Sequence, residues 1–188
     1  MEMIDVRFSL EAKTLLMSMM GNVFQCYKCD LFENSPSAYG VVGIKVDDTG
    51  YAFTNFVKVA DYFGKAEDVA MFKLKQIDYN EIKSPYRVPN MVEIKVEKII
   101  SEIIIINEKQ TLFENNLKKY EVNVTRGVIF KFRDGDELSL EKNIWFSEEI
   151  TVRNGCDLIN LFEPVEEFYE AWSTPCRGEC IREMVVIK

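Results

Sequence analysis

The spacing of hydrophobic and polar residues predicts a helix near the start of the chain. Over residues 9–20, apolar side chains recur every three to four positions, which places them on one face of an α-helix. Ser9 is suited to cap the first turn, and Gly21-Asn22 is suited to end the helix. The same apolar stripe continues toward Cys29, so a longer helix is the alternative. We favour the shorter one.

Most of the following chain has the pattern of β-strands. β-Branched and aromatic residues dominate several short runs, and turn-forming sequences of hairpin length separate them. Asp134-Gly135 is the clearest of these turns, because both residues favour the backbone angles of a tight hairpin. Connections this short predict antiparallel pairing. The expected strands cover residues 39–46, 51–59, 69–77, 91–107, 120–132, 137–141, 149–153 and 181–187.

Residues 103–106 are four consecutive isoleucines, which constrain how the sheet is covered. Successive side chains of a strand point to opposite faces, so a run of isoleucines must be shielded from water on both sides. A sheet with one face open to solvent cannot accommodate this run. We therefore expect the sheet to pack against a second layer or to close on itself.

Helical spacing returns near the C-terminus, first around residues 158–162 and then from Pro164 to Trp172. The predicted fold class is α+β, predominantly antiparallel β in a sandwich or partly closed barrel, with an N-terminal helix and a short C-terminal helical pair. We expect residues 1–188 to form a single domain, and the two prolines within residues 84–90 mark the one place where it could be subdivided.

Length and composition are those of a globular protein: 188 residues with 47% hydrophobic and 29% charged side chains. No apolar run approaches the roughly 18 residues that a membrane helix needs, and the first residues lack the order of a signal peptide. We therefore expect a cytoplasmic protein that does not enter a membrane.

The net charge of −8 is concentrated in one part of the chain. Residues 134–183 hold thirteen acidic and four basic side chains, whereas the remainder is close to neutral. Nucleic acids are bound by clustered lysines and arginines, so this balance argues against a nucleic-acid partner. A solvated acidic surface is one interpretation, and docking of a basic protein is the other.

The chain contains no histidine, which excludes histidine-dependent catalytic triads and histidine-ligated metal sites. Cysteine offers one remaining metal chemistry, because two close pairs could supply the four thiolates of a structural zinc site. These pairs are Cys26 with Cys29 and Cys176 with Cys180. On a strand, however, Cys26 and Cys29 would point to opposite faces. Buried reduced cysteines without any cofactor are the alternative.

Carboxylates offer a second chemistry. The segment Val92-Glu93-Ile94-Lys95-Val96 resembles the Glu-x-Lys strand of the restriction-endonuclease-like nuclease superfamily. This resemblance implies that Glu93 and an upstream aspartate, here Asp78, would hold a divalent cation while Lys95 orients the attacking water. Glu81-Ile82-Lys83 matches the same short pattern.

We therefore carry three functional hypotheses. The first is a non-enzymatic module that binds another protein, with a basic partner docking on an acidic C-terminal surface within residues 134–183. The second is a metal-dependent hydrolase that uses Asp78, Glu93 and Lys95. The third is a zinc-stabilised structural module.

Overall fold

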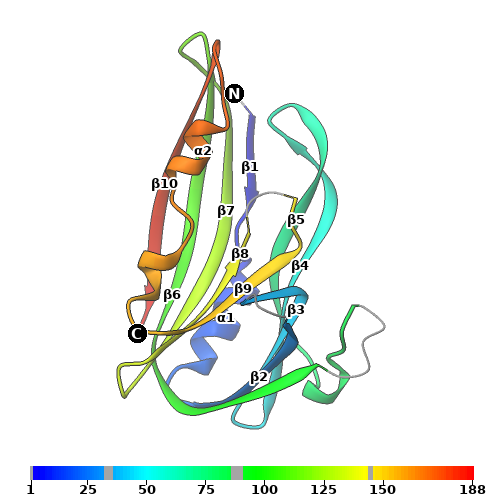
Figure 1. Ribbon diagram of the computed structural model, residues 1–188, viewed down its shortest axis with the longest axis vertical. Coiled ribbons are helices and arrows are strands. Elements are labelled where there is room, and N and C mark those ends of the chain that lie inside the picture. Colours follow the sequence, from blue (N-terminus) through cyan, green and yellow to red (C-terminus); the bar gives the residue numbers. More distant parts are fainter. Residues whose placement is uncertain (1, 32–35, 86–90, 144–145) are drawn as a thin grey trace.

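The computed structural model describes residues 2–31, 36–85, 91–143 and 146–188 (Figure 1). These residues form an elongated molecule that is mostly β-strand, with few helices. The elements in chain order are β1 (Glu2–Val6), α1 (Leu10–Met19), β2 (Val23–Leu31), β3 (Ser37–Val46), β4 (Thr49–Tyr62), β5 (Lys65–Gln76), η1 (Tyr79–Glu81), β6 (Val92–Glu114), β7 (Leu117–Phe132), β8 (Glu137–Lys142), β9 (Glu149–Gly155), η2 (Leu158–Leu161), α2 (Glu166–Glu170) and β10 (Cys176–Ile187).

Six strands close into a ring. In the order β2, β3, β9, β8, β7 and β6, each strand pairs antiparallel with the next, and β6 also pairs with β2. A closed ring leaves none of these strands with an unpaired edge along its whole length. Parallel pairing occurs between β1 and β7. The predicted α+β class with a predominantly antiparallel sheet is confirmed.

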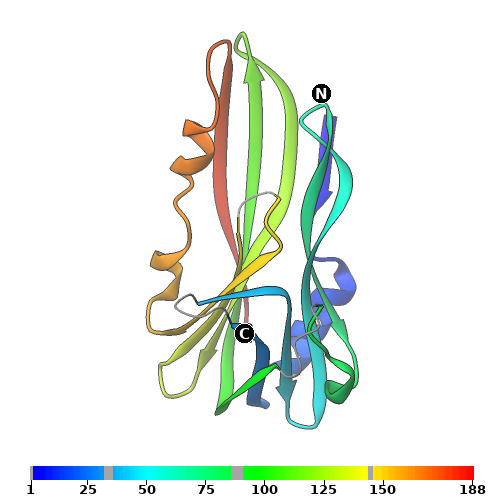
Figure 2. The same ribbon diagram turned by 45° about the vertical axis from the view of Figure 1, so that its right-hand side comes forward.

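Two long hairpins extend from the ring toward the same end of the molecule (Figure 2). One consists of β6 and β7, which continue past the ring and gain β1 and β10 as further neighbours. The other consists of β4 and β5. Strand β6 pairs with β2 through Val92–Ile99, and with β7 and β10 through its later residues. Near the end of the first part, Glu97 has a φ of 55°, which is unusual for a strand residue.

The isoleucine run of β6 is covered on both faces, as the sequence predicts. Ile103 and Ile105 belong to the main core inside the ring, together with Phe24 and Phe130. Ile104 and Ile106 face outward and pack with Ile129 and Phe162 in a second cluster. The segment that contains η2 therefore acts as the outer cover of β6 and β7.

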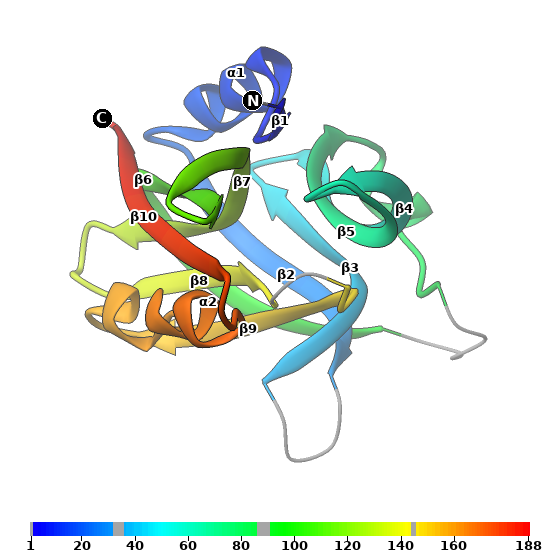
Figure 3. The same cartoon turned by 90° about the horizontal axis from the view of Figure 1, so that it is seen from above.

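Helix α1 packs against the main core by burying Ala12, Leu16 and Met19. The side chain of Ser9 accepts a hydrogen bond from the Ala12 N–H and caps the first turn, as expected. The helix ends at Met19, and Gly21 follows with a φ of 79°, so the shorter of the two predicted helices is correct. Seen from above, α1 and α2 lie on opposite sides of β6 and β7 (Figure 3).

The segment proposed as a subdivision point, residues 84–90, falls largely outside the described residues, which resume at Met91. The strands on either side of it belong to one hydrogen-bonded sheet. Among the described residues, no helix has the length and apolar character that crossing a membrane requires.

Candidate protein-interaction surface

The acidic residues of segment 134–183 divide into an internal group and a surface group. Among the residues that the structure describes, six of the thirteen carboxylates form ion pairs with lysine or arginine. Glu137 and Glu141 among them are buried, so their charge is not available to a partner. Part of the acidity that the sequence assigns to a surface is therefore used inside the fold.

The internal group is organised by Arg126, which is buried at 3% exposure. Strand β7 carries an extra residue at this point, since Gly127 pairs with Ile106 and Thr125 with Asn107, and the resulting β-bulge falls on Arg126. Its guanidinium lies 2.9 Å from Glu163 and 3.6 Å from each of Glu108 and Glu141. Two further arginines form ion pairs with these glutamates: Arg153 with Glu141, and Arg182 with Glu108. We call these three arginines and three glutamates the charge cluster.

The charge cluster holds three arginines and three glutamates, and it borders Lys142. Lys142 is 2% exposed, and its ammonium donates a hydrogen bond of 3.0 Å to the Asn143 carbonyl. Burial, followed by the nearby positive charge of Arg126, lowers the pKa of Lys142 to about 7. Glu108 and Glu163 act in the opposite direction.

The lowered pKa of Lys142 predicts how stability depends on pH. Between pH 7 and the ordinary lysine pKa of 10.5, the unfolded chain keeps a proton that the folded chain releases, so raising the pH favours folding. From pH 7 to pH 9, we expect the free energy of unfolding to rise by about 2 kcal/mol relative to Lys142→Met. Urea unfolding of both proteins at each pH measures this difference, and identical pH profiles would contradict it.

The surface group of carboxylates gathers on α2. Glu166, Glu167 and Glu170 are exposed, and none has a basic side chain within ion-pair distance among the described residues. Helix α2 is only five residues long and is held by its aromatic side: Phe168 and Trp172 contact each other and Phe63. The opposite side of the helix therefore presents unpaired negative charge.

Strand β10 lies next to α2 and is the last strand of the sheet. It pairs with β6 over its whole length, without a register shift. The Tyr169 hydroxyl donates a hydrogen bond of 2.8 Å to the Cys180 carbonyl, so this carbonyl points away from β6. In an antiparallel pair, alternate residues direct both main-chain groups to the same side. The edge of β10 that does not pair with β6 is its open side. The main-chain N–H and C=O groups of Arg182, Met184 and Val186 therefore point to this open side.

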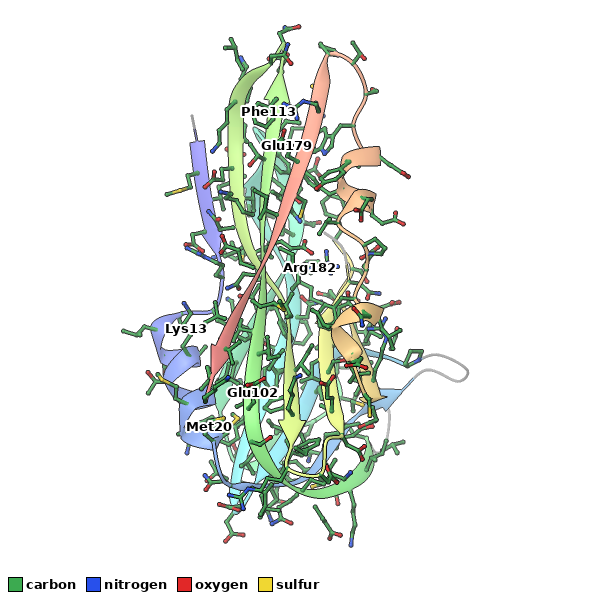
Figure 4. The ribbon with its side chains drawn as sticks, turned by 90° about the vertical axis from the view of Figure 1, so that its left-hand side faces the viewer. Lys13, Met20, Glu102, Phe113, Glu179 and Arg182 are labelled. Atoms are coloured by element: carbon green, nitrogen blue, oxygen red, sulfur yellow. The ribbon has the colours of Figure 1, made fainter. Side chains whose placement is uncertain are left out.

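Strand β10, on which Figure 4 labels Glu179 and Arg182, also exposes apolar side chains on its faces. Ile181, Met184, Val185 and Val186 are each at least 40% exposed. A strand that combines free main-chain groups with exposed apolar side chains is a template for pairing with another chain. We call residues 181–186 together with the three α2 glutamates the β10 edge surface.

The four cysteines considered for zinc do not lie together. Cys26 and Cys29 pair with the first part of β6, opposite Lys95 and Val92, whereas Cys180 pairs with Gln110. Fifteen residues separate Lys95 from Gln110 along β6, which corresponds to roughly 50 Å of strand. Cys26 and Cys29 also face opposite sides of β2, with Cys29 in the main core and Cys26 against Tyr79. A zinc ion cannot be shared by cysteines in this arrangement.

The three residues considered for hydrolysis, Asp78, Glu93 and Lys95, each contact a different neighbour. Glu93 accepts a hydrogen bond of 2.9 Å from the Tyr79 hydroxyl, and the Cys26 thiol donates to the same hydroxyl over 3.3 Å. The Asp78 carboxylate instead caps η1 by accepting the Asn80 N–H. Lys95 lies 3.8 Å from Glu97. The three side chains thus have different partners.

Within the described residues, no three His, Cys, Asp or Glu side chains are grouped to hold a metal ion. No family model, no curated protein and no solved structure matches the chain.

Two features of this surface are absent from the sequence-based expectations. The first is that β10 begins at Cys176, five residues earlier than the expected strand, which brings Cys180 next to Tyr169. The second is the charge cluster around Arg126. The alternation of Cys176, Gly178 and Cys180 with Arg177 and Glu179 is a signal for the first. The second joins side chains from six separate segments and has no local signal.

Proposed function

We propose that this protein is a non-enzymatic binding module that recognises an extended, basic segment of another protein. The segment adds as a strand to β10 along residues 182–186. The observation that carries this proposal is the open side of β10, where three residues direct main-chain groups away from the sheet. Strand addition to a sheet edge is a common mode of peptide recognition, in which the main chain supplies affinity.

Side chains of the β10 edge surface supply selectivity. Met184 and Val186 lie on one face of β10, and Ile181 and Val185 lie on the other, so alternate apolar side chains of the incoming segment have contacts on both faces. Glu183 is exposed on the same strand. Together with the α2 glutamates, it favours lysine or arginine in the partner and disfavours acidic segments.

A hydrolytic or zinc-based function receives less support from the geometry. The candidate residues for hydrolysis have separate partners, and the candidate cysteines lie at distant points of β6. Binding, by contrast, needs only the exposed groups that β10 and α2 present. The acidic residues of segment 134–183 that lie on α2 then contribute to the binding of a basic partner.

The decisive variant is Met184→Pro. Proline lacks an N–H, and residue 184 directs its N–H away from β6, so the substitution removes a donor from the open side while the β6–β10 hydrogen bonds remain. Met184→Ala is the matched control, because it removes the same side chain and keeps the N–H. Circular dichroism checks that both variants are folded.

Binding can be measured by fluorescence anisotropy with a labelled peptide of about eight residues that alternates valine and lysine. We expect saturable binding that weakens with added salt, a loss of about tenfold or more in affinity for Met184→Pro, and a loss of about threefold or less for Met184→Ala. A valine–glutamate peptide of the same length should bind more weakly.

Three outcomes would contradict the proposal. One is equal binding by the wild type and Met184→Pro, another is equal binding of the lysine and glutamate peptides, and the third is absence of binding to either. A dimer of the protein alone, detected by light scattering and abolished by Met184→Pro, would assign β10 to a second copy of this chain instead.

A further inference from the structure

Helix α2 lies beside the first part of β10 (Figure 1). By the alternation along β10, Gly178 and Cys180 direct their main-chain groups to the same side as Arg182 does. The Tyr169 hydroxyl of α2 donates to the Cys180 carbonyl over 2.8 Å and so uses an acceptor on this side. The open side of β10 is therefore occupied at Cys180 and begins at Arg182.

Gly178 allows α2 to lie close to β10. A Cβ atom at this position would overlap the Trp172 ring and would lie 2.9 Å from the Phe168 ring. Any larger residue would push these two rings away from the strand. The aromatic side of α2 thus packs directly on the main chain of β10, and this packing brings Tyr169 within hydrogen-bond distance of Cys180.

Two further contacts keep α2 in this place. At the tip of the β4–β5 hairpin, Phe63 contacts Phe168 and Trp172 at centroid distances of 5.9 and 5.2 Å. Just before α2, the Glu163 carbonyl accepts a hydrogen bond from the Arg182 guanidinium of β10. A helix of five residues is too short to be stable alone, so these contacts determine where it lies.

We propose that α2 limits the segment that β10 accepts to about five residues, opposite residues 182–186. If an added strand continued further along the edge, one of its N–H groups would need the Cys180 carbonyl, and the Tyr169 hydroxyl holds that acceptor. At the other end, β10 stops at Ile187. This inference rests on the proposed function, and it makes Tyr169 the residue that determines where the bound segment ends.

The limit also makes binding more selective. A long unpaired edge pairs readily with unrelated strands, and proteins prevent such pairing by covering the edge with a helix or a loop. With α2 in place, the free part of the edge offers few main-chain hydrogen bonds. A partner therefore also needs side-chain contacts with the apolar residues of β10 and the glutamates of α2.

The test compares three peptides on the wild type and on Tyr169→Ala by fluorescence anisotropy. The first peptide alternates valine and lysine over about five residues, and the other two carry about four further residues, alternating threonine and valine, at its N-terminus or at its C-terminus. One extension points toward α2 whichever way the segment runs, and the other passes the end of β10. Neither extension adds a charged side chain.

In the wild type, we expect the three peptides to bind within about twofold of one another. In Tyr169→Ala, the peptide extended toward α2 should bind about tenfold more tightly than the short one, because the main-chain groups of Cys180 become available to it. Glu170→Gln is the control on α2: it keeps Tyr169 and should weaken all three peptides alike. Circular dichroism checks that both variants are folded.

Amide hydrogen exchange measured by NMR locates the bound segment. The Met184 N–H should gain protection from every peptide in both proteins, whereas the Cys180 N–H should gain it only in Tyr169→Ala with the peptide extended toward α2. Equal affinities of the three peptides for Tyr169→Ala, or about tenfold tighter binding of one extended peptide by the wild type, would overturn the length limit and leave the proposed function standing. If none of the peptides binds the wild type, the proposed function fails and the length limit fails with it.

Discussion

Replacing Arg126 with methionine should lower the free energy of unfolding by about 3–5 kcal/mol. Arg126 is 3% exposed and lies within ion-pair distance of Glu108, Glu141 and Glu163. Its removal leaves carboxylates in the interior without their main counter-charge. Removing one partner of a buried ion pair is far more costly than losing an exposed pair, because the remaining charge stays desolvated.

Urea unfolding followed by circular dichroism measures this loss. Arg177→Met is the matched control, since Arg177 pairs with Glu179 where both side chains are about half exposed, and an exposed pair contributes at most about 1 kcal/mol. Similar destabilisation by the two substitutions would show that the charge cluster does not stabilise the fold more than a surface ion pair does.

Replacing Phe24 with alanine should lower the free energy of unfolding by about 3–5 kcal/mol as well. Phe24 is fully buried inside the ring, and its side chain meets Phe130 and Phe132 edge-to-face at centroid distances of 5.2 and 5.8 Å. These three residues come from β2 and β7, which are not neighbours in the sheet. The substitution therefore opens a void where the two sides of the ring meet.

The same urea experiment applies to Phe24→Ala. Leu117→Ala serves as its control, because Leu117 is 66% exposed at the start of β7 and its truncation should cost about 0.5 kcal/mol or less. A loss below about 1 kcal/mol for Phe24→Ala would mean that the ring interior relaxes to fill the space.

Local sequence signals were sufficient for much of this fold. Asp134-Gly135 predicts the β7–β8 hairpin, which the structure contains. The isoleucine run of β6 predicts cover on both faces, and the two faces indeed belong to different clusters. These signals succeed because turn chemistry and side-chain alternation are properties of a few adjacent residues.

Other elements depend on contacts between distant residues and could not be predicted locally. Strand β1 pairs with β7, more than one hundred residues later, and its first residues carry no clear alternation. Strands β4 and β5 are longer than expected and meet at a turn where Phe63 has a φ of 56°. An aromatic residue is an unusual choice for that conformation, so the turn has no recognisable sequence.

The acidic segment shows the same limit for the candidate site. Its composition is evident from the sequence, but the division into buried and exposed carboxylates depends on which arginines reach them. Arg126 lies outside the segment on β7, yet it neutralises Glu141 and Glu163 within it. Among the described residues, exposed glutamates without such partners gather on α2, which therefore keeps part of the surface charge that composition assigns to the whole segment.

The closed ring also determines how quickly the chain can fold. Its β3–β9 contact joins Ser37 to Thr151, which are 114 residues apart. Proteins dominated by such distant pairings fold over milliseconds to seconds, because the entropy of bringing the ends together is lost before the contacts form. Until β9 arrives, the ring is open and the isoleucines of β6 remain accessible to water and to other chains. During synthesis, this interval is when the protein is most vulnerable to aggregation.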